Sequence, residues 1–235
     1  MAQPPTPLHA YELNGSLADT YGGPAITNNG GSLGAAGITF LANNGPSLEN
    51  WIAGTATSGN YSIEMYFSIT TTSSYRKLID FSNRSSDNGL YNLSTSLSFY
   101  PMTTGSNGAI TDNVMTHLVL TRDGTTGDVF GYINGSITLG ISFTDSSNFA
   151  TFTGTNNIMH FFRDDSVTSF NEASDGFVDF IRIYDRPLSA SEAALLFAAI
   201  PEPTSIALAC FGMAGVVALK PWKRFARRHR RAKSA

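Results

Sequence analysis

The sequence contains little cysteine, little charge and few signatures of catalysis. Cys210 is the single cysteine among 235 residues, so no disulfide can close within the chain. Charged residues make up only 14% of the composition. The sequence has no His-Glu-x-x-His zinc motif, no phosphate-binding glycine loop and no Glu-x-Asp-x-x-Glu set of catalytic carboxylates. We therefore predict that the protein is not an enzyme.

The first seven residues, Met-Ala-Gln-Pro-Pro-Thr-Pro, have neither the basic start nor the apolar stretch of an export signal. The tail described next nevertheless implies export. We therefore expect an export leader upstream of this sequence, and we interpret residues 1–7 as the N-terminal extension of the mature protein.

The last 35 residues differ in composition from the rest of the chain. A stiff connector, residues 200–204, contains Pro201, Glu202 and Pro203, and a run without charge follows over residues 205–219. Eight of the 15 Lys and Arg residues lie in the basic end, residues 220–235, whereas all 18 Asp and Glu residues precede it. These eight are Lys220, Lys223, Arg224, Arg227, Arg228, Arg230, Arg231 and Lys233.

Three interpretations of this tail compete. Fifteen residues of helix cover roughly 22 Å, less than the ~30 Å hydrocarbon core, so length alone favours a buried helix of a soluble domain. A basic arm for nucleic acid is the second interpretation, but the acidic body and the apolar run argue against it. The basic end favours the third, a single transmembrane helix whose positive end lies in the cytoplasm. The order of connector, apolar run and basic end resembles the PEP-CTERM sorting tail of exported bacterial proteins, which implies processing by an exosortase.

The body of the chain alternates apolar and polar residues. Residues 61–69 place every second side chain, from Tyr61 to Ile69, on one apolar face, which is typical of a half-buried strand. Turn signals at Asp123-Gly124 and Asn134-Gly135 separate further candidates. These candidate strands are Tyr75–Phe81, Ser96–Tyr100, Met115–Thr121, Val129–Ile133, Ser136–Phe143, Ile158–Phe162 and Phe177–Tyr184. Strands at this spacing without intervening helices predict an antiparallel β-sandwich.

One helix is predicted before the tail, over Ser189–Ala199. Ser189 as N-cap and Glu192 three residues later form the pattern of a capping box. The helix ends before Pro201, because proline disfavours helical geometry in the preceding residue. We therefore predict a domain over residues 8–199.

Four blocks of the body resemble LamG-like, concanavalin-type jelly rolls. The most specific is GFVDFIRIYDRPLSASEAALL, residues 176–196, which is similar to the closing strand and helix of that family. Residues 11–23, 61–69 and 116–136 resemble the opening strand and loop, an early core strand and the central hairpin. The resemblance implies an all-β jelly roll with one short C-terminal helix, followed here by the predicted transmembrane helix.

Two acidic segments are candidates for binding calcium, which takes about six to eight hard oxygen ligands. Asp-Asn-Gly at residues 87–89 is equally a common turn, and a pair of Asp residues in a loop is usually solvated. A resemblance to the calcium site of pentraxins, a branch of the same superfamily, implies a ligand role for both segments. The implied Ca²⁺ ligands are Asp87, Asn88, Asp164, Asp165 and Glu172.

Other polar and aromatic residues leave alternatives open. Glu64 and Arg182 belong either to a solvent-exposed face or to a buried pair, and we expect His117 and His160 to be packed inside. Four aromatic residues either stack on sugar rings or belong to the core: Trp51, Tyr66, Tyr91 and Tyr100.

We therefore expect an exported envelope or matrix protein without enzymatic activity. A membrane-anchored precursor would be held at the inner membrane and then displayed at the cell surface or in the matrix. Its jelly roll would bind exopolysaccharide, a surface glycan or a protein in a calcium-dependent manner, and we expect no nucleic-acid partner. The alternatives are a structural component without a discrete ligand and a polysaccharide-degrading enzyme on the same fold.

Overall fold

The computed structural model describes residues 3–201. The chain divides into two units, Met1–Ala199 and Ile200–Ala235. Glu202, Pro203, the predicted transmembrane segment 205–219 and the basic end 220–235 lie outside the described residues. Within residues 3–201, no helix has the length and apolar composition that crossing a bilayer requires.

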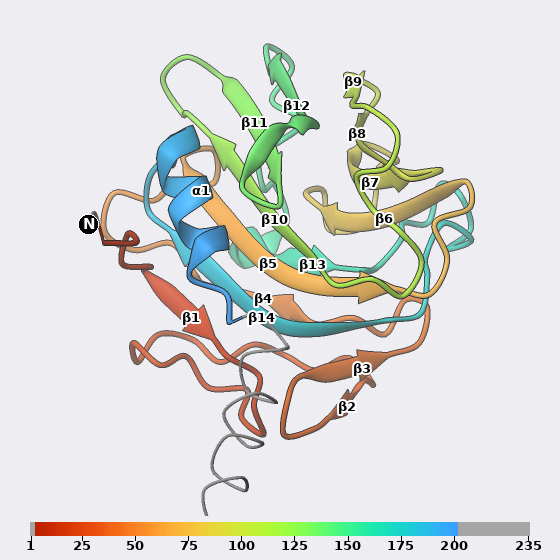
Figure 1. Ribbon diagram of the computed structural model, residues 1–235, viewed down its shortest axis with the longest axis horizontal. Coiled ribbons are helices and arrows are strands. Elements are labelled where there is room, and N and C mark those ends of the chain that lie inside the picture. Colours follow the sequence, from red (N-terminus) through yellow and green to blue (C-terminus); the bar gives the residue numbers. More distant parts are fainter. Residues whose placement is uncertain (1–2, 202–235) are drawn as a thin grey trace, which may run out of the picture. The chain divides into compact units, whose positions relative to one another are not determined.

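Two antiparallel sheets form a β-sandwich (Figure 1). The first sheet has eight strands in the order β12-β11-β10-β5-β14-β3-β2, and β1 pairs with β14 beside this path. Its strands are β1 His9–Tyr11, β2 Ser32–Leu33, β3 Ile38–Phe40, β5 Tyr61–Ile69, β10 Thr116–Arg122, β11 Asp128–Ile133, β12 Ser136–Thr144 and β14 Gly176–Tyr184.

The second sheet has six strands in the order β4-β13-β6-β7-β8-β9. They are β4 Ser47–Leu48, β6 Tyr75–Asp80, β7 Gly89–Leu93, β8 Ser96–Tyr100, β9 Thr103–Thr104 and β13 Met159–Phe161, and a short 3-10 helix, Thr155–Asn157, precedes β13. Both the predicted sandwich and the predicted strand segments of the body are confirmed.

The core lies between the sheets and is built by alternation along the strands. On β5, Ile63, Met65 and Phe67 are fully buried and belong to the same apolar cluster as Leu90 of β7 and Phe99 of β8. Side chains that alternate along a strand point to opposite faces of a sheet. The residues between these core positions therefore face outward, and they build the polar sites described below.

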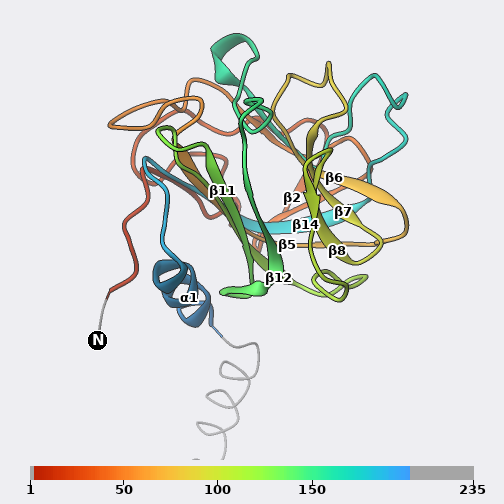
Figure 2. The ribbon, with the colours of Figure 1, turned by 90° about the horizontal axis from the view of Figure 1, so that it is seen from above.

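Helix α1, Ala190–Ala198, closes the domain as predicted. The Ser189 side chain accepts from the Glu192 backbone N–H, and Glu192 accepts in return from the Ser189 backbone, which completes the capping box. The helix covers β10, β11 and β14, on the side away from β6–β8 (Figure 2). Its Leu196 and Ala193 share a small apolar cluster with Val119, Tyr132 and Tyr184.

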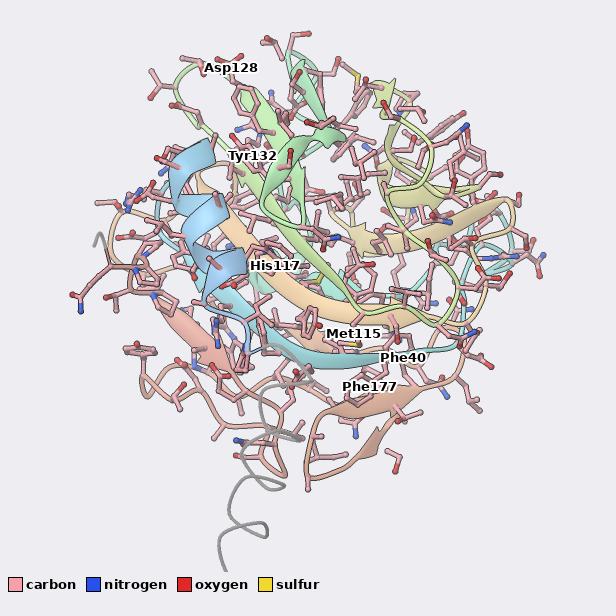
Figure 3. All side chains as sticks on the ribbon, in the orientation of Figure 1. Phe40, Met115, His117, Asp128, Tyr132 and Phe177 are labelled. Atoms are coloured by element: carbon pink, nitrogen blue, oxygen red, sulfur yellow. The ribbon has the colours of Figure 1, made fainter. Side chains whose placement is uncertain are left out.

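The expectation that β5 is half-buried is wrong. Ser62 and Glu64, on the face away from the core, are as fully buried as the core residues. The reason is that α1 and the segment before it seal that face: Leu188 N donates to the Ser62 hydroxyl, and Phe197 stacks on His117 beside Glu64. Figure 3 labels His117 and Tyr132 next to the helix.

The tight turn at Asn134-Gly135 is confirmed. Both residues have positive φ, 49° and 73°, as a two-residue hairpin between β11 and β12 requires. Gly135 is also close to the helix, because a Cβ atom at this position would lie 2.9 Å from the Cβ of Phe197.

Candidate functional site

The outer face of the six-stranded sheet carries most of the predicted site residues. Lys77 of β6, Tyr91 of β7 and Ser98 of β8 are paired across the strands and form one row on this face. The neighbouring row, Ile79, Leu90 and Phe99, points into the core. The sheet thus separates an apolar interior from a polar and aromatic exterior.

An acidic loop, residues 163–172, lies over this outer face. Phe162 N donates to Leu78 O at 2.9 Å, and Lys77 N donates to Glu172 O at 2.7 Å. The chain therefore leaves the edge of β6 after Phe162 and returns to it at Glu172. The nine residues between these two contacts form an excursion that places Asp164 and Asp165 against the sheet.

Both aspartates of this loop are fully buried and are engaged within the protein. Asp164 Oδ2 accepts from the Thr168 hydroxyl at 2.7 Å and from Glu172 N at 2.8 Å. Asp165 Oδ1 accepts from Val167 N at 2.8 Å. These bonds hold the acidic loop in its conformation, since carboxylates readily accept backbone N–H groups in turns.

Lys77 supplies the positive charge beneath the acidic loop. Its side chain is fully buried, and its Nζ lies 2.5 Å from Asp165 Oδ2 and 3.5 Å from Asp80 Oδ2. The same ammonium group lies 4.5 Å from the centre of the Tyr91 ring. Burial raises the pKa of Asp80, and the charge of Lys77 opposes that rise. A lysine thus occupies the position among carboxylates where the sequence led us to expect a metal ion.

The five predicted calcium ligands do not converge on one point. Asp164 and Asp165 are buried under the loop, whereas Asp87 and Glu172 line a small surface pocket. The Asn88 side-chain oxygen accepts from the Ser82 hydroxyl at 3.2 Å. Within residues 3–201, no three or more His, Cys, Asp or Glu side chains are grouped to hold a metal ion.

One observation favours a cation: Asp164 Oδ1 is buried without a hydrogen-bond partner. A single oxygen is far from the six to eight or so that calcium takes, and Asp165 already has the Lys77 ammonium. The described residues therefore do not fit a calcium site of the predicted composition. Calcium binding stays a prediction of the sequence, whereas the arrangement of the described residues predicts little binding, and titration decides between the two.

The surface pocket has a volume of about 100 Å³ and is lined by Tyr75, Asp87, Tyr100 and Glu172. These side chains lie within electrostatic reach of one another. Burial raises the pKa of Glu172, and the negative charge of Asp87 adds to the rise. Burial also raises the pKa of Tyr75, with contributions from Tyr100, Glu172 and Asp87.

A second hollow of about 220 Å³ shares Tyr75 and Tyr100 with the first and extends to residues 98–104. Tyr75 packs edge-on against both Tyr91 and Tyr100, with ring centres 5.5 and 5.8 Å apart. Tyr100 is 38% exposed. We call the two adjoining hollows the tyrosine groove.

Tyr91 supports the floor of the tyrosine groove. Its hydroxyl donates to Asp87 Oδ1 at 2.9 Å and lies 3.4 Å from Asp165 Oδ2. Burial, followed by the charges of Asp87 and Asp165, raises the pKa of Tyr91 far above its usual range. The phenol therefore stays protonated and fixes the Asp87 carboxylate at the pocket wall.

The four aromatic residues proposed for stacking on sugars have different locations. Trp51 and Tyr91 are fully buried. Tyr66 stacks on Phe180, and both residues belong to the eight-stranded sheet. Tyr100 alone of the four lines the tyrosine groove. Its partner Tyr75 was missed, because the strand pattern does not tell which tyrosine stays accessible at the end of a strand.

The eight-stranded sheet carries a second polar cluster around the fully buried Glu64. Glu64 Oε1 lies 3.0 Å from His117 Nε2, and Glu64 Oε2 accepts from the Tyr184 hydroxyl at 2.6 Å. Burial acts to raise the pKa of Glu64, but His117, Arg182 and Tyr184 outweigh it and hold that pKa below its usual range. Arg182 in turn pairs with Glu12 through two bonds of 2.9 and 3.0 Å. Glu64 is thus the buried centre of a network whose outer pair, Arg182 and Glu12, is partly exposed.

A Gly-x-Ser-x-Gly pattern at residues 30–34 has no catalytic context. Ser32 lies in β2, an edge strand that is followed by β3. The nucleophile of such a motif needs a sharp turn from a strand into a helix. Ser32 is therefore not a candidate nucleophile.

The fold and the sequence define the class of the protein. A two-sheet antiparallel jelly roll with a closing helix is a lectin-type sandwich. The family model of the concanavalin A-like lectin/glucanases superfamily matches residues 36–194. The chain belongs to this superfamily. No curated protein matches the sequence.

Solved structures share this fold at low sequence identity. A Trypanosoma rangeli sialidase bound to 2,3-difluorosialic acid is 16% identical with a TM-score of 0.59, over 82% of this chain and 33% of the sialidase. The binding domain of botulinum neurotoxin serotype D with N-acetylneuraminic acid is 13% identical with a TM-score of 0.59, over 83% of this chain and 51% of that one. Domain 4 of a GH43 extracellular arabinanase from Geobacillus stearothermophilus, in complex with arabinotriose, is 19% identical with a TM-score of 0.53. The alignment with this domain covers 82% of this chain and 98% of the domain.

Proposed function

We propose that the protein binds glycans through the tyrosine groove. The observation that carries this proposal is the pair of tyrosine rings beside two carboxylates: Tyr75 and Tyr100 share the groove with Asp87 and Glu172. Sugars present apolar C–H faces that stack on aromatic rings, and hydroxyls that donate to carboxylates. Two of the similar structures are complexes with arabinotriose and with N-acetylneuraminic acid, and they support a glycan as the ligand class.

The proposal places the protein outside the cytoplasm. The tail with Pro201, Glu202 and Pro203 would direct sorting by an exosortase-type enzyme, with the apolar run 205–219 and the basic end 220–235 anchoring a precursor at the inner membrane. The processed protein would act at the cell surface or in the matrix. Replacing Pro201 and Pro203 with alanine should leave unprocessed precursor in the membrane fraction, and normal release would exclude this sorting route.

A substitution pair tests the glycan site. Tyr100→Ala and Tyr75→Ala should each weaken retention on an exopolysaccharide or glycan array about tenfold or more. Stacking of a nucleobase on one aromatic ring contributes on the order of 1–3 kcal/mol, and we expect a sugar face to contribute about the same. The matched control is Phe130→Ala, because Phe130 is 37% exposed but lies outside the groove. Equal binding by all three variants would exclude the groove as the binding site.

Two alternatives have distinct signatures. A structural component without a discrete ligand would bind no glycan on the array, and none of the variants would differ. An enzyme would release reducing ends or unsaturated sugars from polysaccharide. Glu172 and Asp87 line one pocket, and burial and the charge of Asp87 raise the pKa of Glu172. This arrangement makes the second assay worthwhile, because glycoside hydrolysis uses two carboxyl groups that flank the glycosidic bond.

A further inference from the structure

The smaller pocket of the tyrosine groove is acidic and has no cation of its own. Asp87 and Glu172 both line it. Three basic residues lie nearby in the described part of the chain, and none of them forms an ion pair with Asp87 or Glu172. Lys77 is fully buried against Asp165. Arg84 donates to Asp164 O at 2.6 Å. Arg76 donates to the Ser73 hydroxyl at 3.1 Å and to Asn171 O at 3.4 Å.

The two carboxylates repel each other across the pocket. Asp87 is the strongest charged neighbour acting to raise the pKa of Glu172. Asp87 is also held in place, because its Oδ1 accepts from Tyr91. A positive charge bound between the two side chains would relieve this repulsion.

The tyrosine rings favour an organic cation. Tyr75 and Tyr100 form the remaining walls of the pocket. Ammonium groups are attracted to the faces of aromatic rings and donate up to three hydrogen bonds. A calcium ion would instead need about six to eight oxygen ligands, and phenol rings supply none at their faces.

The adjoining hollow provides room for the rest of the ligand. It is about twice the volume of the pocket, at about 220 Å³ against about 100 Å³, and is bordered by Ser98, Pro101, Thr103 and Thr104. These residues offer three hydroxyls and the apolar ring of Pro101, which suit a sugar ring. An acidic sugar would bring a third negative charge beside Asp87 and Glu172.

We propose that the tyrosine groove selects glycans that carry free amino groups, such as polymers of glucosamine. The ammonium group lies between Asp87 and Glu172, and the sugar ring lies on Tyr100 in the larger hollow. This inference rests on the proposed glycan-binding function and names its substrate class.

The test is calorimetric titration of the full chain in mild detergent with four tetrasaccharides: glucosamine, N-acetylglucosamine, cellotetraose and guluronate. We expect glucosamine tetramer to bind about tenfold or more tightly than its N-acetylated form, since charge-assisted hydrogen bonds are about twice as strong as neutral ones. The preference should weaken as salt is raised from 0.05 to 0.5 M or so. Glu172→Gln and Asp87→Asn should each abolish the preference while leaving residual binding of cellotetraose. The control is Glu49→Gln, because Glu49 is exposed and does not line the groove.

Each result either supports or overturns the assignment. If glucosamine and N-acetylglucosamine tetramers bind equally, and Tyr100→Ala removes both, the glycan site is right and the ammonium assignment is wrong. Tighter binding of guluronate would also overturn it. If no saccharide binds, the proposed function itself fails. A tetralysine peptide is the fifth ligand, and binding of this peptide as tight as that of glucosamine tetramer would assign the pocket to protein amines instead. Melting curves of each variant, compared with the parent, establish that loss of binding is not loss of folding.

Discussion

The outer faces of the two sheets differ in how their buried charged residues are covered. On the eight-stranded sheet, Glu64 is enclosed by His117, Tyr184 and Arg182, and α1 closes the site. On the six-stranded sheet, Lys77 neutralises Asp165, but the acidic loop covers only part of the face. Asp87 and Glu172 therefore stay accessible beside two tyrosines. The comparison teaches that a buried ion network is not by itself a site. The groove qualifies because carboxylates and rings stay exposed at the edge of its network.

The largest expected effect concerns Lys77. Lys77→Met should lower the free energy of unfolding by about 3–5 kcal/mol, because removing one partner leaves Asp165 as an uncompensated buried charge. Denaturant unfolding at neutral pH measures this loss. Arg186→Met is the control: the Arg186–Glu192 pair is largely exposed at Arg186, so its loss should cost about 1 kcal/mol or less. Equal losses of unfolding free energy in both variants would mean that the buried network under the acidic loop contributes no more stability than an exposed ion pair.

The helix that seals the other face is the next target. Leu196→Ala should destabilise the domain by about 2–4 kcal/mol, since Leu196 is nearly fully buried against Val119 and Tyr184. Glycan binding should be unchanged in the folded variant, because α1 lies on the other sheet. If the Leu196→Ala protein melts at a lower temperature and also loses glycan affinity, the two faces are coupled. That result would contradict the view that they act independently.

The sequence predicted the sandwich, but it did not predict which outer face carries the candidate binding groove. The long strand 61–69, the Asn134-Gly135 turn and the Ser189 capping box are local signals, and local signals suffice for elements of that kind. The 2–3-residue strands β1–β4 and β9 are too short to show a period. Strand β7 was missed because Asp87-Asn88-Gly89 reads as a turn, and its following residues are buried on both faces.

The candidate site was predicted only in part, for a physical reason. The pairing of Lys77 with Asp165 joins residues 88 positions apart, and no sequence pattern reports which carboxylates find a buried lysine. Asp87 and Glu172 were singled out as metal ligands and do lie together at one pocket. Tyr75 and Tyr100 line the same pocket. These aromatic rings make the pocket better suited to an organic ligand than to a metal ion, which needs several hard oxygen ligands.

A third prediction concerns calcium and the outer face of the six-stranded sheet, and its expected effect is small. With Lys77 in place, we expect chelation with EDTA or addition of millimolar calcium to shift the melting temperature by less than about 1 °C, because mass action stabilises a protein only through a site it possesses. The predicted ligands Asp87 and Asp165 are tested together by Asp87→Ala with Asp165→Ala, measured in calcium. A calcium-dependent rise in the parent that disappears in this double variant would establish the metal site. A rise confined to Lys77→Met would show that the ammonium had excluded the ion.

A pH-dependent effect is expected at the cap of α1. Glu192 accepts from Arg186 and from the Ser189 backbone, and these contacts, against the opposing effect of burial, lower its pKa from 4.5 to about 2. Because the folded pKa lies below the unfolded one, the stabilisation is complete above about pH 4.5 and is lost as the pH falls towards 2. The pair is partly exposed, so the loss should stay below about 1 kcal/mol. Carboxyl NMR titration of Glu192 gives the pKa directly, and Glu192→Gln should unfold with a flatter pH dependence between pH 2 and 4.5. If the helix cap matters only to the sealed face, Glu192→Gln should lower the melting temperature at neutral pH without changing the affinity of a neutral tetrasaccharide for the groove.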